Sequence, residues 1–449
     1  MQINYSLRRY DFIYGFLSIL CMSIFLFTDD INITISSTAF LMFIIISIIW
    51  GYYNNYILII ISLLLENQLG NLIPQNIQLY TIYLQTQDFA YMVLLVLGVF
   101  FYVKLFYKKN NKYNIKYSFL MWIPLIFISA INTNINYGQN FVLGLFTQRS
   151  ILLYFCSFPM SLAISCDFFD SNKVRDIIIS ISKIYTIISI LQYCIYLYSG
   201  VLFLSIPIQD RVGVRLIYSG CYLLAIAIML MMDEFVKKKI ILSDWIWILL
   251  MMFIILLISQ LRVLSVSLLL AIGLSLLINS KTRVKSIIKL FPLLLIIMFL
   301  FRAPIFDFLN YTINDLNMDS PGSSFGTRVL EKEFYDRNLQ GNEILGMGVL
   351  NDNNAVNSDI TGSSMNYYLN DLGIYELLYN YGYAGILIYF IFILRLMYIG
   401  YNEMKGNNSS LIFMFGLFSI ISSFTVLIFT VRPVLFLMML TIGTQTKKA

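Results

Sequence analysis

Histidine does not occur in this sequence of 449 residues. Its absence excludes a Ser-His-Asp triad, a histidine general base and every metal site with histidine ligands. Cysteine is scarce as well: no Cys-x-x-Cys pair occurs, and five residues stand singly within apolar runs, at Cys21, Cys156, Cys166, Cys194 and Cys221. This pattern is typical of small core residues and predicts neither a redox nor a metal-binding role.

Charged residues are also few. They make up 12% of the chain, whereas 59% is hydrophobic and the mean hydropathy is +0.78. A soluble domain of this size carries about 25% charged residues. Apolar runs long enough to cross a ~30 Å hydrocarbon core as helices recur along the chain, and the alternating segments of a membrane β-barrel are missing. The sequence therefore predicts an all-α integral membrane protein in contact with the lipid bilayer.

The apolar runs divide the chain into three predicted parts. Residues 1–302 hold spans one to about eleven, residues 303–379 form one large outer loop, and residues 380–449 hold the C-terminal spans. The count of about fourteen falls to twelve or thirteen if the second and third runs form a hairpin or the short last run does not cross. The estimated spans are 11–28, 36–52, 56–73, 88–107, 116–133, 146–166, 176–199, 216–235, 243–259, 263–279, 286–302, 380–400, 410–430 and 433–443.

Lysine and arginine are distributed differently across the predicted membrane. The positive-inside rule places both termini in the cytoplasm, with all lysines except Lys332 on that side. The net charge of +6 is explained by this topology, so no nucleic-acid partner is predicted. Arginine does not follow the same rule, because eight residues fall outside: Arg149, Arg211, Arg215, Arg262, Arg302, Arg328, Arg337 and Arg432.

Two explanations of the outer arginines stay open. Several sit at span ends, where the phosphate of a lipid-borne group would lie, and the planar guanidinium grips phosphate bidentately and stays charged. Alternatively, these side chains snorkel or pair with outer acids such as Asp210, Asp319 and Asp336. For a single arginine the second explanation is favoured, and for the set the first.

The shorter outer segment, residues 200–215, ends in Arg211 and Arg215. At positions i and i+4 these arginines would share one face of a helix. Gly213 between them favours a turn equally well.

The large outer loop contains one predicted amphipathic helix, from Arg328 to Leu339. A structureless loop of this length would be unusual, so we expect it to fold over the bundle as a functional cap. The helix is expected to turn one side to water through Glu331, Lys332 and Asp336 and to line the other with Val329, Leu330, Phe334 and Leu339.

A series of motifs follows this helix. Gly346 and Gly348 form a Gly-x-Gly turn, and Asp371 and Leu372 precede Gly382-Tyr-Ala-Gly385 by nine residues. Together with Arg328 at the start of the loop helix, this arrangement resembles the O-antigen polymerase and O-antigen ligase family of bacterial membrane glycosyltransferases. The ligases carry a histidine and a small polar residue where this chain has Asp371 and Leu372. That departure favours a polymerase over a ligase.

Two further pieces agree with the resemblance, which is scattered over about residues 205–400. Arg211 and Arg215 stand in the shorter outer loop, where the family has functional arginines, and Arg262 in SQLRVLS is similar to its short outer turn. The resemblance implies a GT-C-like bundle in the bacterial plasma membrane and an undecaprenyl-pyrophosphate-linked oligosaccharide as donor. It implies no metal and no other cofactor, and a chain-length regulator is a candidate partner.

The residues suggest the same chemistry independently. A sugar on a polyprenyl pyrophosphate has a good leaving group, so transfer needs cations for the departing pyrophosphate and a base near the acceptor hydroxyl. Asp371 is the first candidate for the base, before Glu376 and Asp336, and Arg215 and Arg328 are the catalytic cations. The candidates for binding pyrophosphate or glycan are Arg149, Arg211, Arg262, Arg337, Gly346, Gly348 and Glu376.

Plainer interpretations of the same residues stay open. Asp371 has the side chain of a helix N-cap at the start of the following span. Gly346 and Gly348 need only form a turn, and Gly382 and Gly385 need only allow close helix packing.

The expected function is a polysaccharide polymerase of the O-antigen or capsule type. It would transfer a growing lipid-linked glycan onto a lipid-linked repeat unit at the outer face of the membrane. One alternative is a ligase that moves the finished glycan to a lipid or protein acceptor. The other is a flippase or transporter for lipid-linked oligosaccharides, although transporters usually have two related halves and charges near the midplane.

Overall fold

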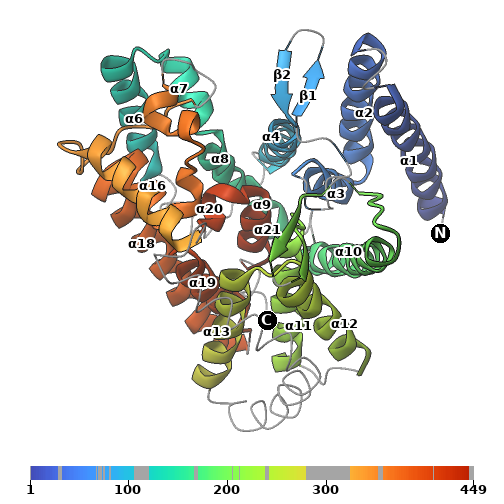
Figure 1. The fold of residues 1–449 in the computed structure, drawn as a ribbon. Helices are drawn as coiled ribbons and strands as arrows, with labels where there is room; N and C mark the ends of the chain where they lie inside the picture. Colours follow the sequence, from blue (N-terminus) through green and yellow to red (C-terminus); the bar gives the residue numbers. More distant parts are fainter. Residues whose placement is uncertain are drawn as a thin grey trace.

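Helices account for nearly all of the regular structure in this computed structural model (Figure 1). The exceptions among the described residues are two antiparallel hairpins, β1 (Asn76–Leu79) with β2 (Ile82–Gln85) and β3 (Ile208–Arg211) with β4 (Gly213–Leu216). The structure describes residues 2–28, 33–66, 68, 73, 76–79, 82–105, 121–165, 170–204, 206–211, 213–237, 242–279, 324–351, 357–407 and 409–443.

The first half of the chain begins with two long helices that pack along each other, α1 and α2 (Figure 1). The helices of this half are α1 (Gln2–Thr28), α2 (Ile33–Tyr53), α3 (Asn55–Leu65), α4 (Thr86–Leu105), α6 (Trp122–Tyr137), α7 (Phe141–Thr147), α8 (Arg149–Leu152), the 3₁₀ turn η1 (Leu153–Cys156), α9 (Ser157–Ser165) and α10 (Ser171–Ser199).

The second half contributes the middle of the bundle, where α21 contacts α9, α10 and α19. Its elements are α11 (Cys221–Lys237), α12 (Leu242–Phe253), the π-helical turn η2 (Ile254–Ile258), α13 (Arg262–Ile278), α16 (Ser324–Leu339), α17 (Ser358–Thr361), the 3₁₀ turns η3 (Ser363–Met365) and η4 (Leu369–Leu372), α18 (Ile374–Asn407), α19 (Leu411–Ser422), α20 (Ile428–Val431) and α21 (Pro433–Gly443).

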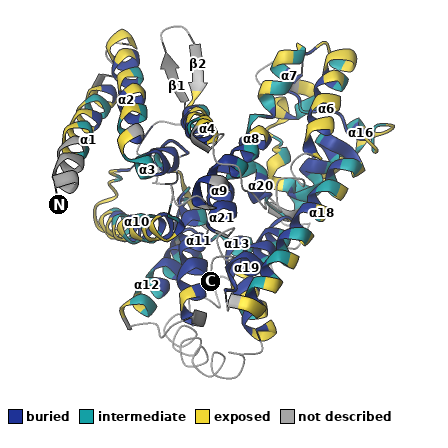
Figure 2. Cartoon of the chain, turned by 180° about the vertical axis from the view of Figure 1, so that it is seen from behind, coloured by how far each residue is buried: buried dark blue, intermediate teal, exposed yellow. Residues whose placement is uncertain are grey.

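Many large apolar residues of the outer helices are exposed. Figure 2 colours the outer helices largely as exposed or intermediate and the inner ones as buried. Phe12 on α1, Tyr198 on α10 and Leu387 on α18 are 77%, 96% and 61% exposed. The inner helices α11 and α21 are buried along nearly their whole described length. An apolar surface around an apolar interior is expected of helices that face hydrocarbon. The predicted class, an all-α membrane protein, is therefore confirmed, with two small hairpins added.

Fewer helices than predicted are long enough to cross a membrane. Among the described residues, four single helices are long and apolar enough: Ile33–Gly51, Thr86–Val103, Ser171–Ser199 and Ile374–Gly406. A fifth candidate is the pair Phe141–Thr147 and Arg149–Ser161, whose halves are bent by 62°. The predicted span 286–302 lies outside the described residues. The predicted count of spans therefore stays a prediction.

Several predicted spans are interrupted by breaks inside the bundle. The span predicted at 56–73 is cut short because α3 ends at Leu65, and the span predicted at 410–430 is divided between α19 and α20. The span predicted at 243–259 changes from α-helix to the π-helical turn η2. Irregular backbone at membrane depth is tolerated where it is buried in protein, and broken helices often line binding sites. The polar groups at these breaks are therefore candidates for a functional site.

The kink in α18 is caused by Gly382, whose φ of 65° and ψ of −165° are not helical. Beyond the kink, the amides of Tyr383 and Ala384 donate to the carbonyls of Glu343 and Ile344 at 2.9 and 3.3 Å. A Cβ atom at Gly382 would lie 2.2 Å from the Ile344 carbonyl oxygen. The close approach predicted for Gly382 therefore exists, but its partner is a loop and not a neighbouring helix.

We expect Gly382→Ala to lower the thermal stability of the detergent-purified protein more than any other glycine-to-alanine change tested beside it. This backbone region is nearly exclusive to glycine, and strain there costs on the order of 1–3 kcal/mol; the added methyl group also overlaps the Ile344 carbonyl. Gly138→Ala tests strain alone, because φ is 66° and no atom lies within 4 Å. Gly273→Ala, in a helix with no atom within 4 Å, tests neither. Equal melting temperatures for the three variants would contradict this ranking.

Candidate functional site

A folded segment docks on α6 and the first part of α18. We call it the cap segment; it comprises residues 324–351 and 357–373. The side-chain amide of Asn132 donates to the Gly346 carbonyl at 2.8 Å, and the Ser129 hydroxyl accepts the Val349 amide at 3.0 Å. Gln139 donates to the Val349 carbonyl at 3.0 Å and accepts the Asn351 amide at 2.8 Å. These bonds fix the cap segment on the bundle.

Gly346 and Gly348 form the turn that the sequence predicts, with φ of 76° and 86°. A Cβ at Gly346 would lie 2.5 Å from the Tyr381 amide nitrogen, and one at Gly348 would lie 2.4 Å from the Thr133 methyl group. Both glycines therefore let the cap segment touch neighbouring elements, Gly346 at α18 and Gly348 at α6. This docking role accounts for their presence without a ligand.

The buried side of α16 differs from the prediction. Glu331, Tyr335 and Leu339 form its inner stripe, at 3%, 0% and 3% exposure, whereas Leu330 is 55% exposed. Placing Glu331 in water and Leu330 inside was therefore wrong. The reason is that the cap segment supplies polar partners: Glu331 accepts the Tyr368 amide at 3.2 Å, and the Tyr335 hydroxyl donates to the Thr361 carbonyl at 2.8 Å.

The water-facing side of α16 agrees better with the prediction. Lys332 is exposed and Asp336 is half-buried, and they form an ion pair of 2.6 Å at positions i and i+4. Burial raises the pKa of Asp336, but hydrogen bonds from Lys332 and from the Tyr375 hydroxyl outweigh it and leave that pKa below its usual value. A carboxylate with a lowered pKa and two donors is a weak general base. Asp336 is therefore the least suitable of the three predicted candidates.

Asp371 lies in η4 with an exposed side chain. Its carboxylate accepts no hydrogen bond from any residue that the structure describes. α18 begins at Ile374, after Gly373 with φ of 58°, so Asp371 does not serve as its N-cap. Burial raises the pKa of Glu331, and the charge of Asp371 raises it further, while the Tyr368 amide and Arg328 lower it. Arg328, Glu331 and Asp371 are therefore electrostatic neighbours within the cap segment.

Arg215 lies in the β3–β4 hairpin, which confirms the turn alternative for residues 200–215 and overturns the helical one. The register pairs Gln209 with Arg215, and one terminal nitrogen of Arg215 donates to the Gln209 side chain at 2.8 Å. Its Nε donates to the Ser259 carbonyl at 2.8 Å. The Arg215 side chain is buried, and both of these acceptors are neutral groups.

The Ser259 carbonyl is available to Arg215 because the chain bends sharply between η2 and α13. Gln260 has a φ of 48°, an uncommon value for a residue other than glycine. α13 then begins with Arg262. The Cys221 thiol, at the start of α11, donates to the Ser259 hydroxyl at 3.2 Å. The hairpin, the bend and the first turn of α11 therefore meet at one end of the bundle.

The next residue of α11, Tyr222, connects this meeting point to two other elements. The guanidinium of Arg432, between α20 and α21, lies 5.5 Å from the centre of the Tyr222 ring. The Asp371 carboxylate lies within electrostatic range of the Tyr222 hydroxyl. We call Arg215, Asp371, Arg432 and the Cys221–Tyr222 turn the arginine cluster. Its charged members come from distant parts of the chain and all act on the first turn of α11.

The other predicted residues occupy different surroundings. Arg149 forms an ion pair with Asp88 and lies 4.8 Å from the Phe146 ring centre, which is the pairing arrangement left open by the sequence. Glu376 is buried and accepts the Thr430 hydroxyl at 3.0 Å, so it contacts α20. Arg337 is exposed in the last turn of α16. The Arg211 side chain and all of Arg302 lie outside the described residues.

Arg432 and Tyr222 were not selected as site residues from the sequence, although a signal for the first exists. Pro433 follows Arg432, and a residue before proline is disfavoured in helix, so the pair marks a break inside an apolar run. Glu66, an acid within another apolar run, is a second signal of the same kind. Tyr222 carries no such signal, because tyrosine is common throughout the chain.

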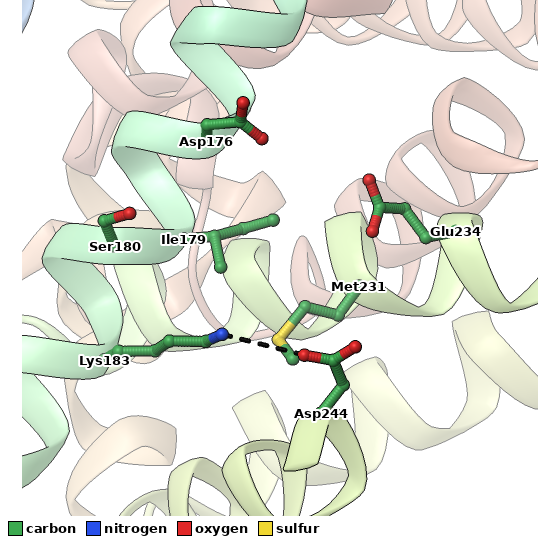
Figure 3. A pocket seen from close by; sticks show the side chains of 7 residues that line it. All are labelled: Asp176, Ile179, Ser180, Lys183, Met231, Glu234 and Asp244. Carbon is green, nitrogen blue, oxygen red and sulfur yellow. Dashed lines mark ion pairs between the residues drawn. The ribbon is translucent and has the colours of Figure 1, made fainter. Parts of the chain in front are cut away.

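The opposite end of α11 holds a different set of charges. A pocket of about 240 Å³ lies between α10, α11 and α12, lined by Asp176, Lys183, Glu234 and Asp244 among others (Figure 3). Lys183 pairs with Asp244 at 3.6 Å, and Arg175 pairs with Glu234 at 3.2 Å. Because these charges largely pair with one another, they tie the three helices together. None of the predicted site residues lines this pocket.

Comparisons with protein-family models, with curated proteins and with solved structures return no match to this chain. The function must therefore be argued from the residues of the arginine cluster and the cap segment. These residues offer a hydrogen-bonded arginine, an arginine that lies over the Tyr222 ring, and an exposed carboxylate within electrostatic range of Tyr222. That combination suits a reaction in which an anionic group leaves and a hydroxyl proton is removed.

Proposed function

We propose that this protein is a polysaccharide polymerase that uses a glycan on undecaprenyl pyrophosphate as donor and a lipid-linked repeat unit as acceptor. The observation that supports it best is the arrangement at the first turn of α11, where Asp371 and Arg432 act electrostatically on Tyr222 and Arg215 and Arg432 act on Cys221. A base and two cations near one another are the groups that such a transfer requires. The resemblance of the sequence to the O-antigen polymerase and ligase family supports the same proposal.

In the proposed reaction, the Asp371 carboxylate takes the proton from an acceptor hydroxyl. The hydroxyl oxygen forms a bond to the anomeric carbon of the donor sugar, and the bond between that carbon and the pyrophosphate oxygen breaks. The electron pair leaves with undecaprenyl pyrophosphate, whose charge Arg215 and Arg328 stabilise. Positioned guanidinium groups stabilise this leaving group without further reorganisation.

The remaining parts of the proposal concern topology and substrate contacts. Both termini lie in the cytoplasm, the cap segment faces the outside of the bacterial plasma membrane, and the full set of spans forms a GT-C-like bundle. Arg211, Arg262 and Arg337 contact pyrophosphate or glycan. The ion pair of Arg149 with Asp88 would have to open before Arg149 did the same.

The test is a deletion strain whose surface glycan is separated by length on a gel. A polymerase leaves single repeats on the acceptor when it is removed, and the plasmid-borne gene restores long chains. Unattached polymer would instead indicate a ligase, and loss of lipid-linked units from the outer face would indicate a flippase. Either of these results would replace the proposed function.

A further inference from the structure

The break between α20 and α21 places an arginine inside the helical bundle. α20 ends at Val431, α21 begins at Pro433, and Arg432 between them has a φ of −134° and a ψ of 60°. The two helices lie at the middle of the bundle (Figure 1), where α21 contacts α3, α9, α10 and α19. An ionised side chain within such a region is expensive to maintain and is usually functional.

The guanidinium of Arg432 has few polar partners. Its Nε is buried without a hydrogen-bond partner, and its side chain makes no hydrogen bond or ion pair with any residue that the structure describes. The side chain as a whole is only partly buried, so a ligand can reach it. The contact that holds it is the face of the Tyr222 ring, at 5.5 Å. An aromatic ring attracts the cation but fills none of its hydrogen-bonding positions.

An acid that acts electrostatically on Arg432, Glu66, makes its hydrogen bonds elsewhere. Its Oε1 accepts the Val434 amide at 2.8 Å, at the first turn of α21, and its Oε2 accepts the Gln68 amide at 3.4 Å. Glu66 acts on Arg432 electrostatically, but its oxygens complete the end of a helix and a loop. The charge of Arg432 is therefore only partly compensated.

Arg175 shows what a fully paired arginine in this chain looks like. It lies near the other end of α11, with ion pairs of 3.5 and 3.2 Å to Asp233 and Glu234 and a hydrogen bond to the Leu230 carbonyl. Its Nε makes no hydrogen bond but lies 3.2 Å from a Glu234 carboxylate oxygen, and its terminal nitrogens face the Asp233 carboxylate and the Leu230 carbonyl. Arg432 lacks this set of partners, although it is placed in a similarly apolar bundle.

A second cation lies close to Arg432. Both Arg215 and Arg432 act electrostatically on the Cys221 thiol, at the first turn of α11. Arg215 donates to the Ser259 carbonyl and to the Gln209 side chain, so two guanidinium groups lie near this turn. Two neighbouring guanidinium groups match the several oxygens of a phosphate or pyrophosphate, and Arg432 Nε is buried without a hydrogen-bond partner.

We propose that Arg432 binds a phosphate of the lipid-linked pyrophosphate, with the Tyr222 ring as the surface against which its guanidinium lies. The assignment rests on the proposed function for the identity of the lipid, but the chemistry it needs is a pyrophosphate group and nothing else. Arg432 is then a cation of the site that lies within the bundle, and Arg215 is a second cation that acts on the same first turn of α11.

The test measures ligand binding by the detergent-purified protein, with undecaprenyl pyrophosphate and inorganic pyrophosphate as separate probes. Arg432→Gln is expected to weaken binding of undecaprenyl pyrophosphate at least tenfold. Arg432→Lys is expected to weaken it less, because lysine keeps the positive charge and loses only the planar set of guanidinium donors. The control is Arg175→Gln, which removes a paired arginine at the far end of α11. It should lower thermal stability without changing binding.

Unchanged binding of both probes by a folded Arg432→Gln or Arg432→Lys variant would overturn the assignment, even if deletion of the gene shortened the glycan. Loss of binding in these variants would support it, even if deletion left the glycan long. Tight binding of inorganic pyrophosphate by the wild type, lost in the variants, would show that the site recognises the pyrophosphate itself. Binding of the lipid probe alone, also lost in the variants, would show that the lipid contributes as well.

Discussion

Replacing Arg215 with lysine is expected to abolish long glycan chains while protein still accumulates in the membrane. The guanidinium of Arg215 donates simultaneously to the Ser259 carbonyl and to the Gln209 side chain, both at 2.8 Å. A single ammonium group cannot bridge both acceptors in the same geometry and still present a flat face to a phosphate. The lysine variant therefore keeps the positive charge but loses the fixed orientation of the hydrogen-bond donors.

The measurement is glycan length on a gel in the deletion strain, with the amount of membrane-inserted protein determined in parallel. Arg175→Lys is the matched control, because Arg175 and Arg215 are 7% and 8% exposed and lie near opposite ends of α11. This control should reduce stability without shortening chains. Arg328→Lys, in the cap segment, should behave like Arg215→Lys. Full-length polymer in the Arg215→Lys and Arg328→Lys variants would contradict the idea that these arginines bind the leaving group.

The class of the protein follows from its composition. The scarcity of charge and the length of the apolar runs already require helices that face hydrocarbon, and exposed side chains such as Phe12 and Leu387 agree with it. The turn at Gly213 and the turn at Gly346 and Gly348 were also within reach, because glycine is one of the strongest local signals for a turn. Each of these inferences depends on local sequence only.

The interrupted spans were beyond a reading of apolar runs. The third predicted span continued to residue 73, although α3 ends at Leu65, because the polar residues after Leu65 are followed by further apolar ones. The bend at Gln260 falls between the predicted spans 243–259 and 263–279, but its backbone geometry has no signal in hydropathy. What ends these helices is a set of polar groups far apart in the sequence, such as the Glu66 carboxylate and the Val434 amide. A long-range partner of this kind leaves no periodic signal in either segment.

The face of α16 was misjudged for a related reason. An amphipathic pattern assumes that acids face water, and Glu331 breaks the assumption because the Tyr368 amide is its partner in the folded cap segment. Tyr335 is also buried with a polar group, because its hydroxyl donates a hydrogen bond to the Thr361 carbonyl of the cap segment. Within this site, the sequence could suggest which residue types matter, but their partners depend on the tertiary contacts of the cap segment.

Asp371→Asn is expected to reduce the rate of polymerisation by roughly 10²- to 10⁴-fold, the usual contribution of a general base. An amide cannot take the proton of the acceptor hydroxyl at neutral pH. The change should cost little stability, because the Asp371 side chain is exposed, accepts no hydrogen bond from a described residue and does not cap α18. Loss of rate without loss of melting temperature is therefore the expected combination.

The measurement is the rate of chain extension by purified protein with a lipid-linked repeat unit, at equal protein amounts. Asp336→Asn is the matched control in the cap segment, since Asp336 is occupied by Lys332 and Tyr375 and should retain its rate. Glu376→Gln separates the remaining candidate, because that buried carboxylate holds Thr430 and its loss should lower stability first. An unaltered rate in Asp371→Asn would end its assignment as the base, and a slow but stable Glu376→Gln variant would move the base to α18.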